Sequence, residues 1–84
     1  MKTYKLVTED GNKNLKEETF KGSFKKARIK TYIMALYAHR INSSYITYWI
    51  LENDHIILQG SIDSFNSKRI VNIVNEYLIF KLSS

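Results

Sequence analysis

The segment from residue 45 to residue 59, YITYWILENDHIILQ, decides the fold. Residues 45–51 and 55–59 are rich in β-branched and aromatic side chains, which favour strands. Between them, Asn53 and Asp54 can both adopt the positive φ that a two-residue hairpin turn requires. The segment therefore predicts a β-hairpin in which Glu52 pairs with His55.

This pairing divides the hairpin into two faces, because successive strand residues point to opposite sides of a sheet. One face is predicted to hold Tyr45, Trp49, Leu51, Ile56, Leu58 and Ile62. The other face is predicted to hold Ile46, Tyr48, Ile50 and Ile57. Both faces are apolar, and a helix packed on the first leaves the second uncovered. We therefore predict that the second face is a protein interface, covered by a second helix, a second copy of the chain or a partner.

The chain before this hairpin predicts two strands and a helix. Residues 4–8 have the pattern of a short strand, and the Asp-Gly and Asn content of residues 9–14 predicts a reversal. Residues 16–21 are predicted to return as the second strand. Residues 24–41 contain no Gly or Pro and follow Ser23, a good N-cap residue, so they predict a helix that ends at residues 42–44.

The chain after the hairpin predicts a terminal helix. Residues 63–67 supply turn and capping side chains. Apolar residues follow at helical spacing, namely Ile70, Val71, Ile73, Val74, Tyr77 and Leu78. Because several of these are β-branched, a final strand over residues 77–82 is the alternative. The predicted order is ββαββα, an α+β fold in which one antiparallel sheet packs with two helices, as a single domain over residues 1–84.

The composition is that of one small globular domain. The 84 residues are 44% hydrophobic and 25% charged, enough for one modest core. The chain has no cysteine, no apolar run of signal-peptide length at its start and no segment apolar enough for a membrane span. It is therefore predicted to be cytoplasmic. Lys, Ile, Asn, Tyr and Phe make up 38 of the 84 residues, which indicates the AT-rich genome of a bacterium, a phage or a mobile element.

Residues able to catalyse a reaction or bind a metal are sparse. Without cysteine, a metal site would depend on His39, His55 and carboxylates. Residues 52–55 bring Glu52, Asp54 and His55 together, but polar side chains gather at any hairpin tip, so this grouping does not indicate a metal site. His39 followed by Ser43 and Ser44 is the ordinary pattern of a helix end. We therefore predict no catalytic residue, no metal and no cofactor, and a protein that is not an enzyme.

Basic residues are the clearest polar signal in this chain of net charge +5. They are Lys21, Lys25, Lys26, Arg28 and Lys30 around the start of the first predicted helix, with Lys68 and Arg69 at the start of the second. Cations are unfavourable at helix N-termini, so this placement is typical of an anion-binding site. An advance of about 100° per residue nevertheless scatters the first group around its helix. A solvated face, an acidic protein partner and a nucleic acid all stay open as interpretations.

Together these features predict a non-catalytic module that binds a macromolecule, a protein in preference to a nucleic acid, either as a monomer or as a homodimer. In kind, though not by any motif, the chain resembles the small accessory proteins of phages and mobile elements, including anti-CRISPR and other inhibitors of host defence. The resemblance implies stoichiometric inhibition of a host nucleoprotein. The alternative is a sequence-tolerant DNA- or RNA-binding domain that uses the basic residues from Lys21 to Lys30.

Overall fold

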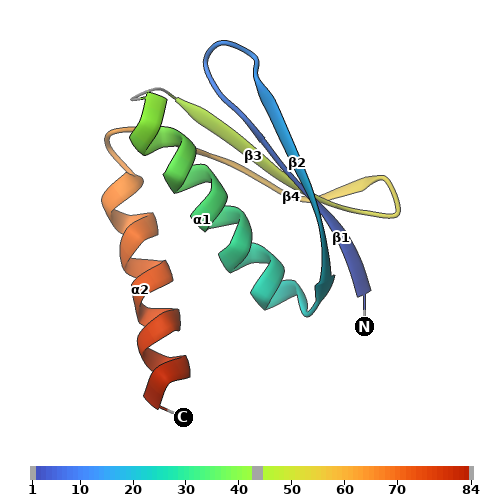
Figure 1. The fold of residues 1–84 in the computed structure, drawn as a ribbon, viewed down its shortest axis with the longest axis vertical. Helices are drawn as coiled ribbons and strands as arrows, with labels where there is room; N and C mark the ends of the chain where they lie inside the picture. The colour runs from blue at the N-terminus through green and yellow to red at the C-terminus, as the bar shows by residue number, and fades with distance from the viewer. Residues whose placement is uncertain (1, 43–44, 84) are drawn as a thin grey trace.

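The computed structural model describes residues 2–42 and 45–83 and shows an α+β fold in two layers (Figure 1). The elements are β1 (Lys2–Glu9), β2 (Leu15–Gly22), α1 (Phe24–Asn42), β3 (Ile46–Glu52), β4 (His55–Ile62) and α2 (Ser67–Ser83). The predicted ββαββα order and fold class are confirmed.

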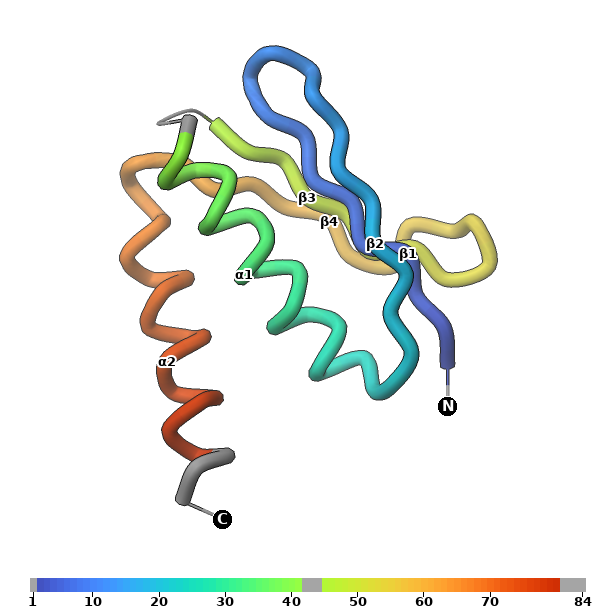
Figure 2. The backbone as a smooth tube through the Cα atoms, in the orientation of Figure 1, coloured from blue at the N-terminus to red at the C-terminus, as the bar shows by residue number. Residues whose placement is uncertain are grey.

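The four strands form one antiparallel sheet in the order β2-β1-β3-β4. The β1–β2 and β3–β4 hairpins meet where β1 pairs with β3, and Val7 lies opposite Trp49 at this junction. α1 lies against one side of the sheet, and α2 runs antiparallel beside α1 (Figures 1 and 2). The sheet is therefore one layer and the helix pair is the other.

The β3–β4 turn has the predicted form. Asn53 and Asp54 have φ values of 52° and 65°, and Glu52 pairs with His55. Asn and Asp tolerate this left-handed backbone better than most residues, so the turn type follows from the local sequence.

The β1–β2 turn is closed by the side chain of Asp10. Its carboxylate accepts hydrogen bonds from the backbone N–H groups of Asn12, at 2.8 Å, and Asn14, at 3.0 Å. The side-chain amide of Asn14 donates a third bond to the same carboxylate at 3.1 Å. The turn thus sets the pairing that begins with Glu9 opposite Leu15.

A β-bulge in β4 changes which residues share a face of the sheet. Ile50 pairs with Leu58, and the next pair along the ladder is Leu51 with Ile56. Ile57 is therefore one extra residue without a partner across the ladder. From Leu58 onward, each β4 side chain lies on the opposite face from the one predicted for a regular hairpin. The predicted face is therefore wrong for Leu58 and Ile62, whereas Trp49, Leu51 and Ile56 share a face as predicted.

α1 begins at the predicted cap. The Ser23 hydroxyl accepts a hydrogen bond from the backbone N–H of Lys26 at 3.2 Å. Ala27, Thr31 and Ala35 are fully buried, and these small side chains let the helix lie close to the sheet. α1 continues to Asn42, and residues 43 and 44 of the predicted helix end lie outside the described residues.

α2 begins with a reciprocal cap. The Asp63 carboxylate accepts the N–H of Asn66 at 2.9 Å, and the Asn66 side-chain oxygen accepts the N–H of Asp63 at 2.9 Å. Ile70 and Val74 are buried in the same cluster as Ile62 on the sheet. The helix continues to Ser83, so the alternative of a final strand over residues 77–82 is wrong.

The core lies between the helix pair and one face of the sheet. It contains Tyr4, Leu6, Ile46, Tyr48, Ile50 and Ile62 from the strands. In the part of the chain that the structure describes, no helix packs on the opposite face, which we call the helix-free face. The strand register places on it Thr3, Lys5, Val7, Glu9, Leu15, Glu17, Thr19, Lys21, Thr47, Trp49, Leu51, Ile56, Gln59 and Ser61.

Candidate binding surfaces

The predicted basic residues do not form one continuous patch. Lys25 and Lys26 are in the first turn of α1, whereas Lys68 and Arg69 are in the first turn of α2. Because the helices are antiparallel, these two turns lie at opposite ends of the pair (Figure 1). Lys21 is separate from both of these groups, because it lies on the helix-free face near the end of β2.

Lys30 already has an acidic partner within the chain. Its Nζ lies 3.2 Å from a carboxylate oxygen of Glu18 on β2. Glu17 faces the other side of the sheet, where it is opposite Val7. The two glutamates therefore do not converge. Because the Lys30 charge is paired with Glu18, Lys30 is not free to bind an external anion.

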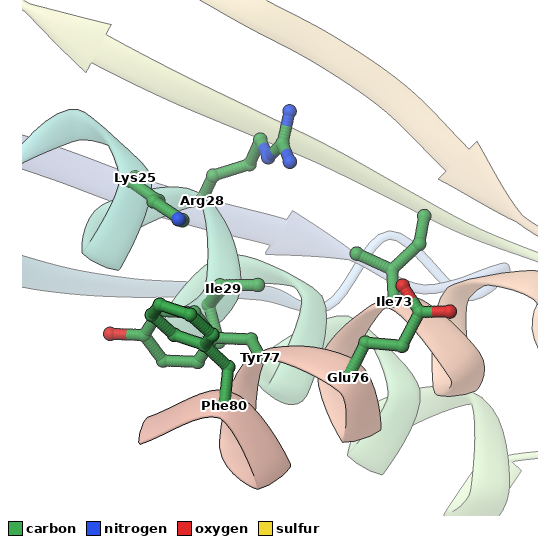
Figure 3. A pocket seen from close by; sticks show the side chains of 7 residues that line it. All are labelled: Lys25, Arg28, Ile29, Ile73, Glu76, Tyr77 and Phe80. Atoms are coloured by element: carbon green, nitrogen blue, oxygen red, sulfur yellow. The ribbon is translucent and has the colours of Figure 1, made fainter. Parts of the chain in front are cut away.

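Lys25 and Arg28 line a groove between the first half of α1 and the second half of α2 (Figure 3). We call it the interhelical groove, and its volume is about 240 Å³. Its lining residues are Lys25, Arg28 and Ile29 from α1 with Ile73, Glu76, Tyr77 and Phe80 from α2. Sequence reasoning found the two cations but missed the α2 residues, because only the antiparallel packing of the helices brings them together.

The Lys25 side chain rests on aromatic rings. Its Nζ is 5.8 Å from the ring centroids of both Tyr77 and Phe80. Figure 3 shows it turned toward these rings. This cation–π contact offsets part of the unfavourable interaction between a lysine and the positive end of the α1 dipole, where the first turn contains no acid.

Arg28 extends from the same helix as Lys25 but points away from the rings that Lys25 contacts (Figure 3). Its guanidinium carbon is 5.7 Å from the ring centroid of Tyr32. Its Nε is buried and has no hydrogen-bond partner among the described residues. A buried donor left unpaired costs about 1–3 kcal/mol, so such groups in native proteins call for an explanation.

Tyr32 connects Arg28 to the core. Its ring meets that of Tyr48 edge-on, with centroids 5.5 Å apart. Burial, with a smaller contribution from Tyr32, raises the pKa of Tyr48, while the charges of Arg69 and Arg28 act in the opposite direction. Because a raised pKa keeps the phenol protonated, Tyr48 acts here as a core residue and a hydrogen-bonding group.

The structure corrects the predicted protein interface: helices of the same chain cover this face, which was one of the three predicted coverings. Ile46, Tyr48 and Ile50 are 0%, 7% and 0% exposed, because they point toward the helices. They have no free surface for a partner in the folded chain. Ile57, at the bulge, is 40% exposed. The two sheet faces are thus exchanged relative to the prediction: the side with Trp49 is the one that lacks a helix.

The centre of the helix-free face is apolar. Val7 and Trp49 form a cross-strand pair there, and Leu51 pairs with Ile56 beside them. Ile56 is 55% exposed, and Trp49 and Leu51 are half-buried. Val7 is 8% exposed, so it lies beneath its neighbours on this face.

The charges on the helix-free face balance. Lys5 and Lys21 are basic, and Glu9 and Glu17 are acidic. The strands place one aromatic side chain on this face, that of Trp49. The face is therefore an apolar centre with a neutral rim.

The histidines lie apart from any metal-binding cluster. Among the described residues, no three His, Asp or Glu side chains are grouped closely enough to hold a metal ion. His55 is exposed at the β3–β4 turn, and His39 is half-exposed on α1. Ser43 and Ser44, which the sequence places near His39, lie outside the described residues.

No family model, curated protein or solved structure matches this chain. In the described residues, neither helix combines the length and apolar character that a membrane span needs. The helix-free face and the interhelical groove are the two candidate binding surfaces of the chain.

Proposed function

We propose that this protein is a non-catalytic protein-binding module and that it binds its partner through the helix-free face. The observation that carries the proposal is the apolar centre of Trp49, Leu51 and Ile56, around the buried Val7, on a sheet face without a helix. Burying such a centre against another protein gains about 25 cal/mol for each Å² of apolar surface removed from water.

The charge balance of the face supports a protein partner over a nucleic acid. Nucleic-acid affinity depends on cations that neutralise phosphates, and the acids Glu9 and Glu17 offset Lys5 and Lys21 on this face. On the helix-free face itself, the strands supply one aromatic side chain for base stacking, the half-buried Trp49, and no excess of cations. A nucleic-acid surface would combine several aromatics with an excess of cations on this face.

The partner that fits is a protein with an apolar, flat surface. A host nucleoprotein bound stoichiometrically, as by an accessory protein of a phage or mobile element, is the biological setting that the composition favours. A second copy of the chain would present the same neutral rim and apolar centre, so a homodimer is the other protein arrangement to test.

The experiment compares two isoleucines of similar exposure on different surfaces. Ile56, 55% exposed, is on the helix-free face, and Ile33, 42% exposed, is on α1. Ile56→Lys should abolish capture of the partner from nuclease-treated host lysate, whereas Ile33→Lys should retain it. Capture should change little between low and high salt, since an apolar contact is not screened.

Sedimentation of the purified chain identifies the homodimer. A dimer that Ile56→Lys converts to a folded monomer would make a second copy the partner. A chain that stays monomeric and captures the same proteins with and without Ile56→Lys contradicts the proposal. Capture that disappears on nuclease treatment and falls steeply with salt would favour the nucleic-acid alternative instead.

A further inference from the structure

The interhelical groove combines an apolar floor with cationic edges. Ile29 is buried and Ile73 is half-buried at its base, while Lys25 and Arg28 stand on the α1 side. Its volume of about 240 Å³ is below the roughly 300–1,000 Å³ of pockets for drug-sized ligands. The groove therefore has the size for a single side chain of a larger ligand.

Neither cation of the groove has an acidic partner among the described residues. Lys25 contacts aromatic rings, which supply no oxygen acceptor for its N–H donors. Arg28 stacks on Tyr32 and has its Nε buried without a hydrogen bond. Glu76 lines the same groove from α2 but forms no ion pair with either of them. The groove thus carries a net positive charge and unused donors.

We propose that the interhelical groove binds an acidic segment of a protein, with one apolar or aromatic side chain inserted between α1 and α2 and flanking carboxylates on Lys25 and Arg28. Arginine and aromatic residues dominate binding energy at protein interfaces, and the groove contains Arg28, Tyr77 and Phe80. The guanidinium fork is suited to a carboxylate, to which it can donate two parallel hydrogen bonds.

A polypeptide fits this groove better than a nucleic acid does. Lys25 lies over the rings of Tyr77 and Phe80, so a base stacked on that side of the rings would have to displace it. Glu76 opposes any anion in the groove, but it opposes a continuous run of phosphates more than a peptide whose carboxylates lie only on the α1 side. The small apolar floor instead matches one side chain.

The groove is independent of the helix-free face, which lies on the other layer of the molecule. This inference therefore goes beyond the proposed function and can fail separately from it. Ile56→Lys, which tests the helix-free face, should leave binding at the groove unchanged.

The test uses a short capped peptide in which glutamates flank a central phenylalanine, titrated into the intact chain and followed by NMR. The peptide should shift the signals of Ile29, Ile73 and Tyr77. Lys25→Gln should weaken binding on the order of tenfold, as the loss of one charge-assisted hydrogen bond does. Lys26→Gln is the matched control, because Lys26 is the next residue of the same helix, is exposed and does not line the groove; it should change the affinity less than about twofold.

A substitution of Glu76 should change the peptide affinity in the opposite direction from Lys25→Gln. Glu76→Gln removes a like charge from the groove and should tighten peptide binding by about twofold to fivefold. A purely structural role for the groove does not predict this gain. Circular dichroism of each variant confirms that it is folded.

Three results would overturn the inference. The first is an acidic peptide that leaves the groove signals unmoved. The second is a control peptide, with glutamines in place of the glutamates, that binds as tightly as the acidic one. The third is a short oligothymidylate that binds the same residues more tightly and with a steep dependence on salt, which would assign the groove to nucleic acid.

Discussion

The ring of Tyr48 lies against Gly60, its partner across the β3–β4 ladder. A methyl group on residue 60 would overlap both the hydroxyl group and the ring of Tyr48. The other side of this contact is Tyr32 on α1, which meets the Tyr48 ring edge-on. The missing side chain at position 60 is therefore what lets an aromatic pair fill the space between α1 and the edge strand.

The first prediction concerns this contact. Gly60→Ala should lower the free energy of unfolding by about 1–3 kcal/mol, because the added methyl group forces the buried Tyr48 ring to move. In an open strand position the same change would be slightly stabilising, so the overlap decides the sign. Urea denaturation measures the effect. Gln59→Ala, at the adjacent exposed position on the helix-free face, is the control and should have little effect.

The second prediction concerns the start of α2. Asp63→Ala and Asn66→Ala should each lower the free energy of unfolding by about 0.5–2 kcal/mol, because each removes a partner of the reciprocal cap. Their combined effect should be smaller than the sum, because either substitution alone breaks the shared pair. Thermal unfolding of the two single variants and the double variant measures this coupling. Strict additivity would show that the two side chains act separately.

Local chemistry made most of the fold predictable from the sequence. Asn53 and Asp54 determine a two-residue turn, and Ser23 marks the start of α1. The β-branched residues of α2 left a strand open as an alternative, and helix formation prevailed because Ile70 and Val74 bury one helical face against α1 and the sheet.

The faces of the β4 residues from Leu58 onward could not be assigned correctly, because one residue decides them. Ile57 is an extra residue in a ladder that otherwise alternates regularly, and no glycine or charge at that position marks a bulge. The interhelical groove could not be predicted from the sequence either, because it depends on how two helices that are distant in the sequence pack side by side. Spacing along one helix carries no such information.

The third prediction uses two isoleucines to test which face of the sheet the helices cover. Ile50→Ala should lower the free energy of unfolding by about 2–5 kcal/mol, because Ile50 is fully buried beneath the helices. Ile56→Ala should cost less than about 1 kcal/mol, because Ile56 is 55% exposed on the helix-free face. A regular hairpin with a helix over the Trp49 face predicts the reverse order. Urea denaturation of the two variants therefore distinguishes the two arrangements.

The fourth prediction concerns the β1–β2 turn. Hydrogen bonds from the backbone N–H and then from the side-chain amide of Asn14 hold the pKa of the Asp10 carboxyl below its ordinary value. Because the folded pKa is the lower one, the ionised carboxylate stabilises the fold above the ordinary pKa of an aspartate. This contribution is lost as the pH falls through the folded value. An NMR titration of the Asp10 carboxyl carbon should place its midpoint below that of an unfolded aspartate.

Two asparagine variants distinguish the contribution of the Asn14 side chain to the lowered Asp10 pKa from that of the backbone N–H groups. Asn14→Ala removes the side-chain bond to Asp10 but leaves the backbone bond, so the midpoint of the Asp10 titration should rise part of the way toward the ordinary value. Asn12→Ala is the matched control, because Asn12 contributes only its backbone N–H, which alanine retains. Equal midpoints in the wild type and Asn14→Ala would show that the side-chain amide of Asn14 does not stabilise the carboxylate.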